Sequence, residues 1–148
     1  MSEDSPMVRQ ISFIIVVRRI KIMGIAITVG MIAIYLFGLL VAKNNIKENF
    51  EVVNLLALVF LVMTIPAALY LRRSMFKKVN LQNFQSNYFN AHVIPFAIID
   101  FASLFCITTN LFVNANILYA SIGLVLSVAG MIICFPNEED FEKIRSEP

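Results

Sequence analysis

Polar residues that could carry chemistry gather in one stretch of this sequence, between residues 92 and 114. Asp100 is the only acidic residue inside the apolar run over residues 93–113. At about 100° per residue of a helix, five polar side chains of this stretch fall on one stripe: His92, Asp100, Ser103, Asn110 and Asn114. An acid that faces lipid costs roughly 2.5–3.5 kcal/mol. The stripe is therefore expected to face the interior of a helix bundle.

Two roles are open for Asp100. It could carry a proton or a small cation, with His92 relaying protons at the mouth of the bundle. Alternatively it joins helices through a hydrogen bond, with Thr28 or Tyr35 as candidate partners. A single acid without a basic partner in the membrane makes a poor pump, so the joining role is favoured.

The other residue types form no catalytic or metal-binding pattern. One histidine and two separated cysteines, Cys106 and Cys134, cannot supply four zinc ligands. The sequence contains no glycine-rich phosphate loop, dinucleotide fingerprint or nucleophile paired with a base. We therefore expect no enzymatic activity and no catalytic, cofactor-binding or metal-binding residues. The net charge of +2 is too small to indicate a nucleic-acid partner.

Composition indicates the elements that hold these residues. Hydrophobic residues make up 59% of the 148 residues, against about 45–50% in soluble domains. Four runs are long enough to cross a lipid bilayer, at about residues 20–42, 52–71, 93–113 and 117–135. The predicted fold is all-α: one domain, an integral membrane four-helix bundle of two antiparallel transmembrane hairpins. Residues 136–148 are then a cytoplasmic tail.

The segments before and between these runs indicate where the membrane spans begin and end. Residues 11–17 are apolar but too short to cross, so they lie in the headgroup layer or extend the first helix, and extension is favoured. Residues 80–90 alternate polar and aromatic side chains, which predicts a segment on the membrane surface. Residues 114–116 leave room only for a tight turn, so the third and fourth spans should be antiparallel neighbours.

Small and weakly polar residues follow one face of the first span and one face of the fourth span. Such faces are typical of close helix–helix contact in lipid. The stripe on the first span comprises Gly24, Thr28, Met31, Tyr35, Gly38 and Ala42. The stripe on the fourth span comprises Ala120, Gly123, Ser127, Gly130 and Cys134.

The distribution of Lys and Arg predicts the orientation. If both termini and the loop over residues 72–92 share one side, that side carries ten of the twelve Lys and Arg residues. Lys43 and Lys47 are left for the other side. The positive-inside rule then places both termini in the cytoplasm and the protein in the cell (inner) membrane. Cations near the span ends are predicted to anchor lipid headgroups: Arg18, Arg19, Arg72, Arg73, Lys77 and Lys78.

The second half resembles a known family in three features: His92 before the third span, the AIIDFASLF stretch over residues 97–105, and the FPNEEDFEKI ending over residues 135–144. It is similar there to uncharacterised small four-helix inner-membrane proteins of bacteria. Their acid is often a glutamate followed by a small residue, whereas here Asp100 precedes Phe101. The resemblance implies fold and location, without an activity. The layout of two similar hairpins also resembles duplicated rotor-ring subunits of rotary ATPases, although a glycine-rich first helix is missing.

The expected function follows from these features. The lipid bilayer is one partner, and we expect a structural or accessory subunit that packs against a membrane-protein partner or against copies of itself. The alternative is a proton or small-cation carrier that uses Asp100. The lack of catalytic groups and of a second buried charge favours the first expectation.

Overall fold

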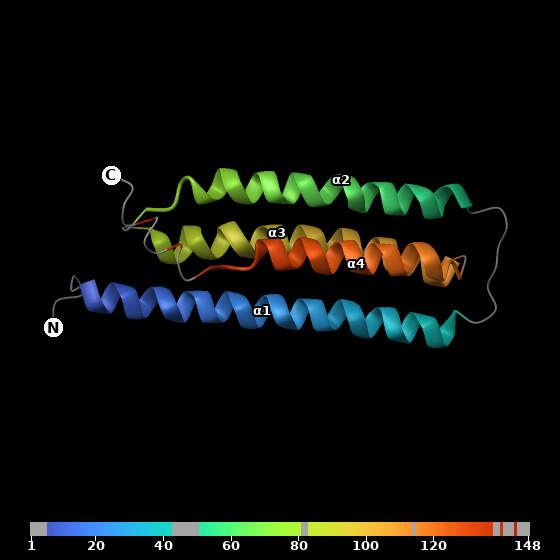
Figure 1. Cartoon of the computed structure of the whole chain (residues 1–148), viewed down its shortest axis with the longest axis horizontal. Coiled ribbons are helices and arrows are strands. Elements are labelled where there is room, and N and C mark those ends of the chain that lie inside the picture. The colour runs from blue at the N-terminus through green and yellow to red at the C-terminus, as the bar shows by residue number, and fades with distance from the viewer. Residues whose placement is uncertain are drawn as a thin grey trace.

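The computed structural model describes residues 6–42, 51–80, 83–113, 115–137, 140 and 144, with side chains from residue 10 onward. In this part of the chain every regular element is helical. The elements are α1 (Pro6–Val41), α2 (Glu51–Phe76), α3 (Phe84–Thr108), a π-helix η2 (Thr109–Val113) that continues α3, and α4 (Ile117–Cys134). Successive α-helices run in opposite directions in an elongated bundle (Figure 1). The prediction of an all-α four-helix bundle is confirmed.

The four helices are long and apolar enough to cross a bilayer. Their outer surfaces are apolar too, because Leu40, Met63 and Val125 are 74%, 70% and 67% exposed. A soluble bundle would turn polar side chains outward. Exposed apolar side chains are instead suited to contact with lipid tails. These features are consistent with a multi-pass membrane protein. The helical segments that are long and apolar enough to cross a bilayer are Gln10–Val41, Glu51–Phe76, Phe84–Val113 and Ile117–Cys134.

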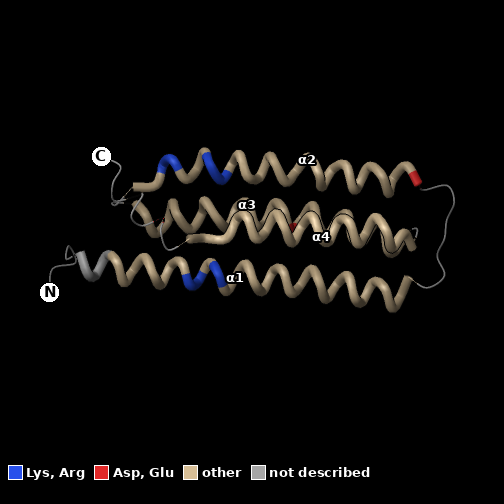
Figure 2. The backbone as a smooth tube through the Cα atoms, viewed as in Figure 1, with Lys and Arg blue, Asp and Glu red and all other residues tan. Residues whose placement is uncertain are grey.

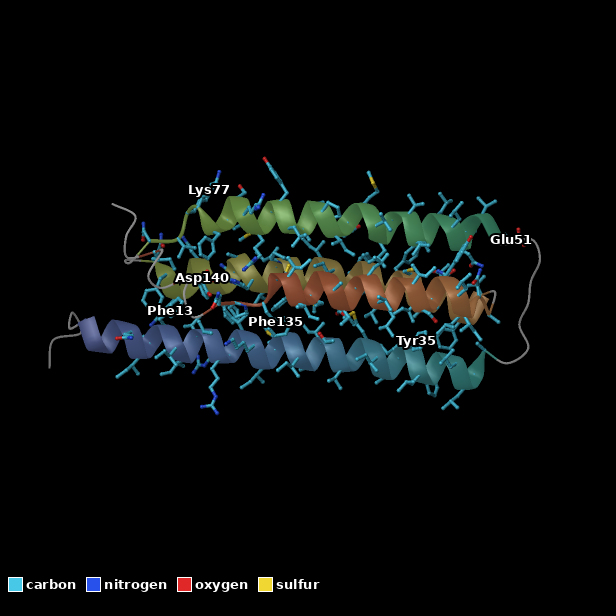
Figure 3. All side chains as sticks on the ribbon, viewed as in Figure 1. Phe13, Tyr35, Glu51, Lys77, Phe135 and Asp140 are labelled. Carbon is cyan, nitrogen blue, oxygen red and sulfur yellow. The ribbon has the colours of Figure 1, made fainter. Side chains whose placement is uncertain are left out.

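The bundle has one end that we call the basic end, where α1 and α3 begin and α2 and α4 end. The cations of α1 and α2 lie toward it (Figure 2). Phe13, Lys77 and Asp140 lie at this end, whereas Glu51 lies at the opposite end (Figure 3). The described cations of the basic end are Arg18, Arg19, Lys21, Arg72, Arg73, Lys77 and Lys78.

Three helices extend beyond the predicted spans at the basic end, and α2 does so by continuing to Phe76, past the predicted end at residue 71. α1 begins at Pro6, so residues 11–17 extend the first helix, as favoured. α3 begins at Phe84, so residues 84–92 are helical and continuous with the predicted third span, while the membrane-surface position expected for residues 80–90 stays a prediction. The ring of Phe13 lies 6.2 Å from the ring of Phe84 and 5.0 Å from that of Tyr88, measured between centroids. Burial of these aromatic rings stabilises helical turns that hydropathy alone does not predict.

The stripes of small residues are confirmed as contact faces. All five residues of the α4 stripe are buried, and in the stripe predicted on the first span the four residues other than Thr28 and Tyr35 are buried. A Cβ atom added at Gly123 would lie 2.7 Å from the Cys106 sulfur, so α3 and α4 approach closely there. The helices therefore pack through small side chains, as helices in lipid do.

Candidate functional site

The structure separates the polar stripe predicted on α3 into different environments. His92, Ser103 and Asn110 are completely buried, whereas Asp100 is half-buried at the edge of the packed face. Asn114 lies outside the described residues. α3 packs against all three other α-helices, which explains why its inward side is covered. The buried members of the stripe bond to three separate sets of groups, one near each end and one in the middle.

Serine hydroxyls join α3 to α4 in the middle of the bundle. Oγ of Ser103 lies 2.6 Å from Oγ of Ser127, and both residues are completely buried. A second hydroxyl pair joins α1 to α4, because Oη of Tyr35 lies 2.6 Å from Oγ of Ser121. Interhelical bonds of this kind contribute about 0.6–2 kcal/mol each in membranes. They supply the joining role that the sequence assigns to Asp100.

At the basic end, His92 joins α3 to α2. Its Nε2 lies 3.1 Å from Nη2 of Arg72, and its Nδ1 lies 2.9 Å from the carbonyl oxygen of Tyr88. Arg72 also donates to the carbonyl oxygens of Ile133 and Phe135, at 3.2 and 3.4 Å. These carbonyls belong to the C-terminal end of α4, where the helix dipole favours a cation. Arg72 thus connects α2, α3 and the end of α4.

A second contact at the basic end fastens the chain after α4 to α3. The hydroxyl of Tyr88 donates to Oδ2 of Asp140 at 3.0 Å, and both residues are buried. The same oxygen accepts the backbone N–H of Asn137 at 3.3 Å. Because this contact joins residues 52 positions apart, it holds the segment after α4 against the bundle.

Asp100 differs from its neighbours on the stripe. Its carboxyl group has no hydrogen bond or ion pair with the described residues. Side chains added at Gly24 and Gly38 would meet Phe96 and Leu111, so α1 and α3 run in parallel with an offset of 72 to 73 residues (96 − 24 and 111 − 38). Asp100 is therefore level with Thr28.

Neither predicted partner bonds to Asp100. The hydroxyl of Thr28 donates to the carbonyl oxygen of Gly24 in its own helix, at 2.8 Å. Tyr35 bonds to Ser121 instead. Phe101, next to Asp100 on the outer side of α3, is 68% exposed. The carboxyl group thus lies between the packed interior and the outer surface of the bundle.

Toward the opposite end, two buried asparagines have unpaired amide atoms. Both amide atoms of Asn54 and Oδ1 of Asn110 lack a partner among the described residues, although Nδ2 of Asn110 donates to the Cys106 carbonyl at 2.8 Å. The ring of Phe60 in α2 contacts the ring of Phe105 in α3. Because α2 and α3 are antiparallel, Asn54, six residues before Phe60, is nearly level with Asn110, five residues after Phe105. Each unpaired buried amide atom costs about 1–3 kcal/mol. Asn110 also lies in η2, and π-helical turns are frequent at functional sites.

Of the predicted headgroup anchors, five are exposed, as contact with headgroups requires: Arg18, Arg19, Arg73, Lys77 and Lys78. Arg72 is half-buried and bonded to the interior, so its role is partly structural.

Sequence reasoning did not assign roles to Asn54, Ser121 or the Tyr88–Asp140 pair. The sequence does single out Asn54, since it is the first strongly polar residue inside the second apolar run. The pairing of Tyr88 with Asp140 has no local signal.

No group of three or more His, Cys, Asp and Glu side chains within the described residues could hold a metal ion. Cys106 and Cys134 are buried free thiols. Comparisons with protein-family models, curated proteins and solved structures find no significant match to this chain. A function must therefore be inferred from the geometry of the polar groups.

Proposed function

We propose that this protein is a structural or accessory subunit that packs against a partner chain in the membrane, with Asp100 on the contact face. One observation carries the proposal: the half-buried Asp100 carboxyl has no bond within the described chain. An unpaired acid in hydrocarbon costs roughly 2.5–3.5 kcal/mol. A hydrogen-bond donor from a neighbouring chain would offset this cost, because acids inside membranes usually pair with other polar groups.

The surface beside Asp100 supports a helix–helix contact. Ala97 lies one turn earlier on α3 and is exposed, so a partner helix can approach the backbone there. Phe101 and Phe105 are 68% and 46% exposed on the neighbouring part of α3. Aromatic side chains beside a small residue are suited to pack around a second helix.

The same carboxyl group favours one alternative, a carrier of protons or small cations. A half-exposed carboxyl without a bond can exchange a proton or a cation. The predicted relay through His92 has less support, because both ring nitrogens of His92 are engaged by Arg72 and Tyr88. No hydrogen bond between described residues links His92 to Asp100.

Our first prediction compares Asp100→Asn with Asp100→Leu. The amide of Asn keeps a hydrogen-bonding group at this position, whereas Leu removes it. After gentle detergent extraction, native mass spectrometry should show the wild type and Asp100→Asn in a complex of the same mass. In Asp100→Leu the affinity of that complex should fall about 3- to 30-fold, which corresponds to one interhelical bond.

Thr108→Val is the matched control. Thr108 is also a half-buried polar residue of α3, but its hydroxyl donates to the carbonyl of Leu104 in its own helix at 2.6 Å. This variant should keep the complex. Undiminished assembly of Asp100→Leu would overturn the proposal. If Asp100→Asn assembles and melts like the wild type but loses a proton or cation flux, the carrier alternative takes its place.

For location, we propose the inner membrane of a cell with both termini in the cytoplasm. The proposal rests on the ten Lys and Arg residues of one side against two on the other. The basic end of the bundle would then face the cytoplasm.

A further inference from the structure

A pocket opens at the basic end, between the end of α2 and the segment that follows α4. Its volume is about 610 Å³, within the range of about 300–1,000 Å³ that is common for small-molecule sites. The pocket is separate from the surface around Asp100. Its lining residues are Arg72, Arg73, Phe76, Lys77, Ile133, Phe135, Asn137 and Asp140.

The described lining of the pocket carries an excess of positive charge. Among these described residues three are cations, and one, Asp140, is an acid. The side chains of Arg73 and Lys77 form no hydrogen bond or ion pair with the described residues. The three hydrogen-bond partners of Arg72 are two carbonyl oxygens and an imidazole nitrogen, none of which carries a formal negative charge. An anion in the pocket would therefore meet cations whose charge these partners do not neutralise.

The position of Arg72 determines which groups can reach it and compensate its positive charge. It follows Leu71, the last residue of the second predicted span, and this boundary predicts a position at the depth of lipid headgroups. Its guanidinium is held in place by α3 and by the end of α4. Fixed Arg groups recognise phosphate well, because their planar donors match its oxygens.

We propose that this pocket binds a phosphate group. The apolar side chains of Phe76, Ile133 and Phe135 line the same pocket. They are suited to contact the glycerol and upper acyl region of a phospholipid whose phosphate lies beside Arg73 and Lys77. A soluble phosphate compound carries the same anionic group, so the test separates these two sources.

The test uses the full chain and a pair of charge-matched double variants. Arg73→Gln with Lys77→Gln removes two pocket cations. Arg19→Gln with Lys78→Gln removes two exposed cations of the basic end that do not line the pocket. Because the four side chains are exposed, both double variants should fold. Their thermal unfolding in detergent should match that of the wild type.

Binding is measured for phosphatidylglycerol and phosphatidylcholine by native mass spectrometry, and for inorganic phosphate by its competition with the retained lipid. We expect retention of a phospholipid that weakens about tenfold or more in the pocket variant and about twofold or less in the control variant. Competition by inorganic phosphate would show that the phosphate group suffices, and its failure would assign the site to the lipid. Equal losses in both variants, or no saturable binding of either probe, would overturn the proposal.

Discussion

The imidazole of His92 lies between two groups that determine which of its nitrogens carries hydrogen. The guanidinium of Arg72 can only donate, so Nε2 of His92, at 3.1 Å, must accept. The carbonyl of Tyr88 can only accept, so Nδ1, at 2.9 Å, must donate. Both contacts are satisfied by one form, the neutral imidazole with hydrogen on Nδ1.

This form can be observed directly, because His92 is the only histidine of the chain. We predict that ¹⁵N NMR of histidine-labelled protein in detergent shows a protonated Nδ1 and an unprotonated Nε2 at neutral pH. In Arg72→Leu, which removes the donor, the fraction with hydrogen on Nε2 should rise. Tyr70→Phe is a control, since Tyr70 is an exposed residue of the same helix. A doubly protonated ring in the wild type at pH 7 would contradict the assignment.

Residue types predicted which groups are polar inside the bundle, but not how they pair. Periodicity placed His92, Ser103 and Asn110 on one stripe, and all three are buried. Ser103 bonds to Ser127 because a close approach of α3 and α4 brings two small side chains together. That approach depends on the relative shift of the helices, which neither helix determines alone. Thr28 and Tyr35, the partners predicted for Asp100, were wrong because each bonds elsewhere. The burial predicted for the stripe is complete at His92, Ser103 and Asn110 and partial at Asp100.

Among the elements, the contact between α3 and α4 is sensitive to an added methyl group. A Cβ at Gly123 would lie 2.7 Å from Sγ of Cys106, whereas a Cβ at Gly30 would have no atom within 4 Å. We predict that Gly123→Ala destabilises the protein by about 1–3 kcal/mol through overpacking. Gly30→Ala should leave stability unchanged or raise it slightly, because Ala favours helix.

Thermal unfolding in detergent measures both glycine variants. A double variant tests the cause: Cys106→Ala removes the sulfur that the new methyl group would meet. In the Cys106→Ala background, Gly123→Ala should cost clearly less than in the wild type, because the two sites are coupled. Equal costs in the two backgrounds would contradict the assigned contact.

Element boundaries show where hydropathy stops being informative. The fourth span was predicted over residues 117–135, and α4 covers Ile117–Cys134, because apolar composition and helix coincide there. α3 begins nine residues before the predicted third span (93 − 84), since Phe84 and Tyr88 are buried against Phe13. A contact between residues about 70 positions apart stabilises those turns, and a local window of sequence cannot contain it.

At the scale of the whole molecule, the two ends of the bundle differ in chemistry. The basic end contains a network of Arg72, His92, Tyr88 and Asp140 that joins three helices and the segment after α4. Toward the opposite end, the described bundle holds Asn54 and Asn110 with unpaired amide atoms. A bundle with one cationic end has a preferred orientation in a bilayer, because Lys and Arg are retained on the cytoplasmic side.

The orientation leads to the last prediction. Single cysteines would be introduced at Ser2, Asn45, Asn83, Asn114 and Ser146 in a chain in which Cys106 and Cys134 are replaced by Ala. A maleimide that cannot cross membranes should label positions 45 and 114 in intact cells. Positions 2, 83 and 146 should react only after the cytoplasm is opened, because the predicted topology puts ten of the twelve Lys and Arg residues on their side. Labelling of position 45 from the cytoplasm alone would reverse the assigned orientation and place the phosphate pocket on the outer face.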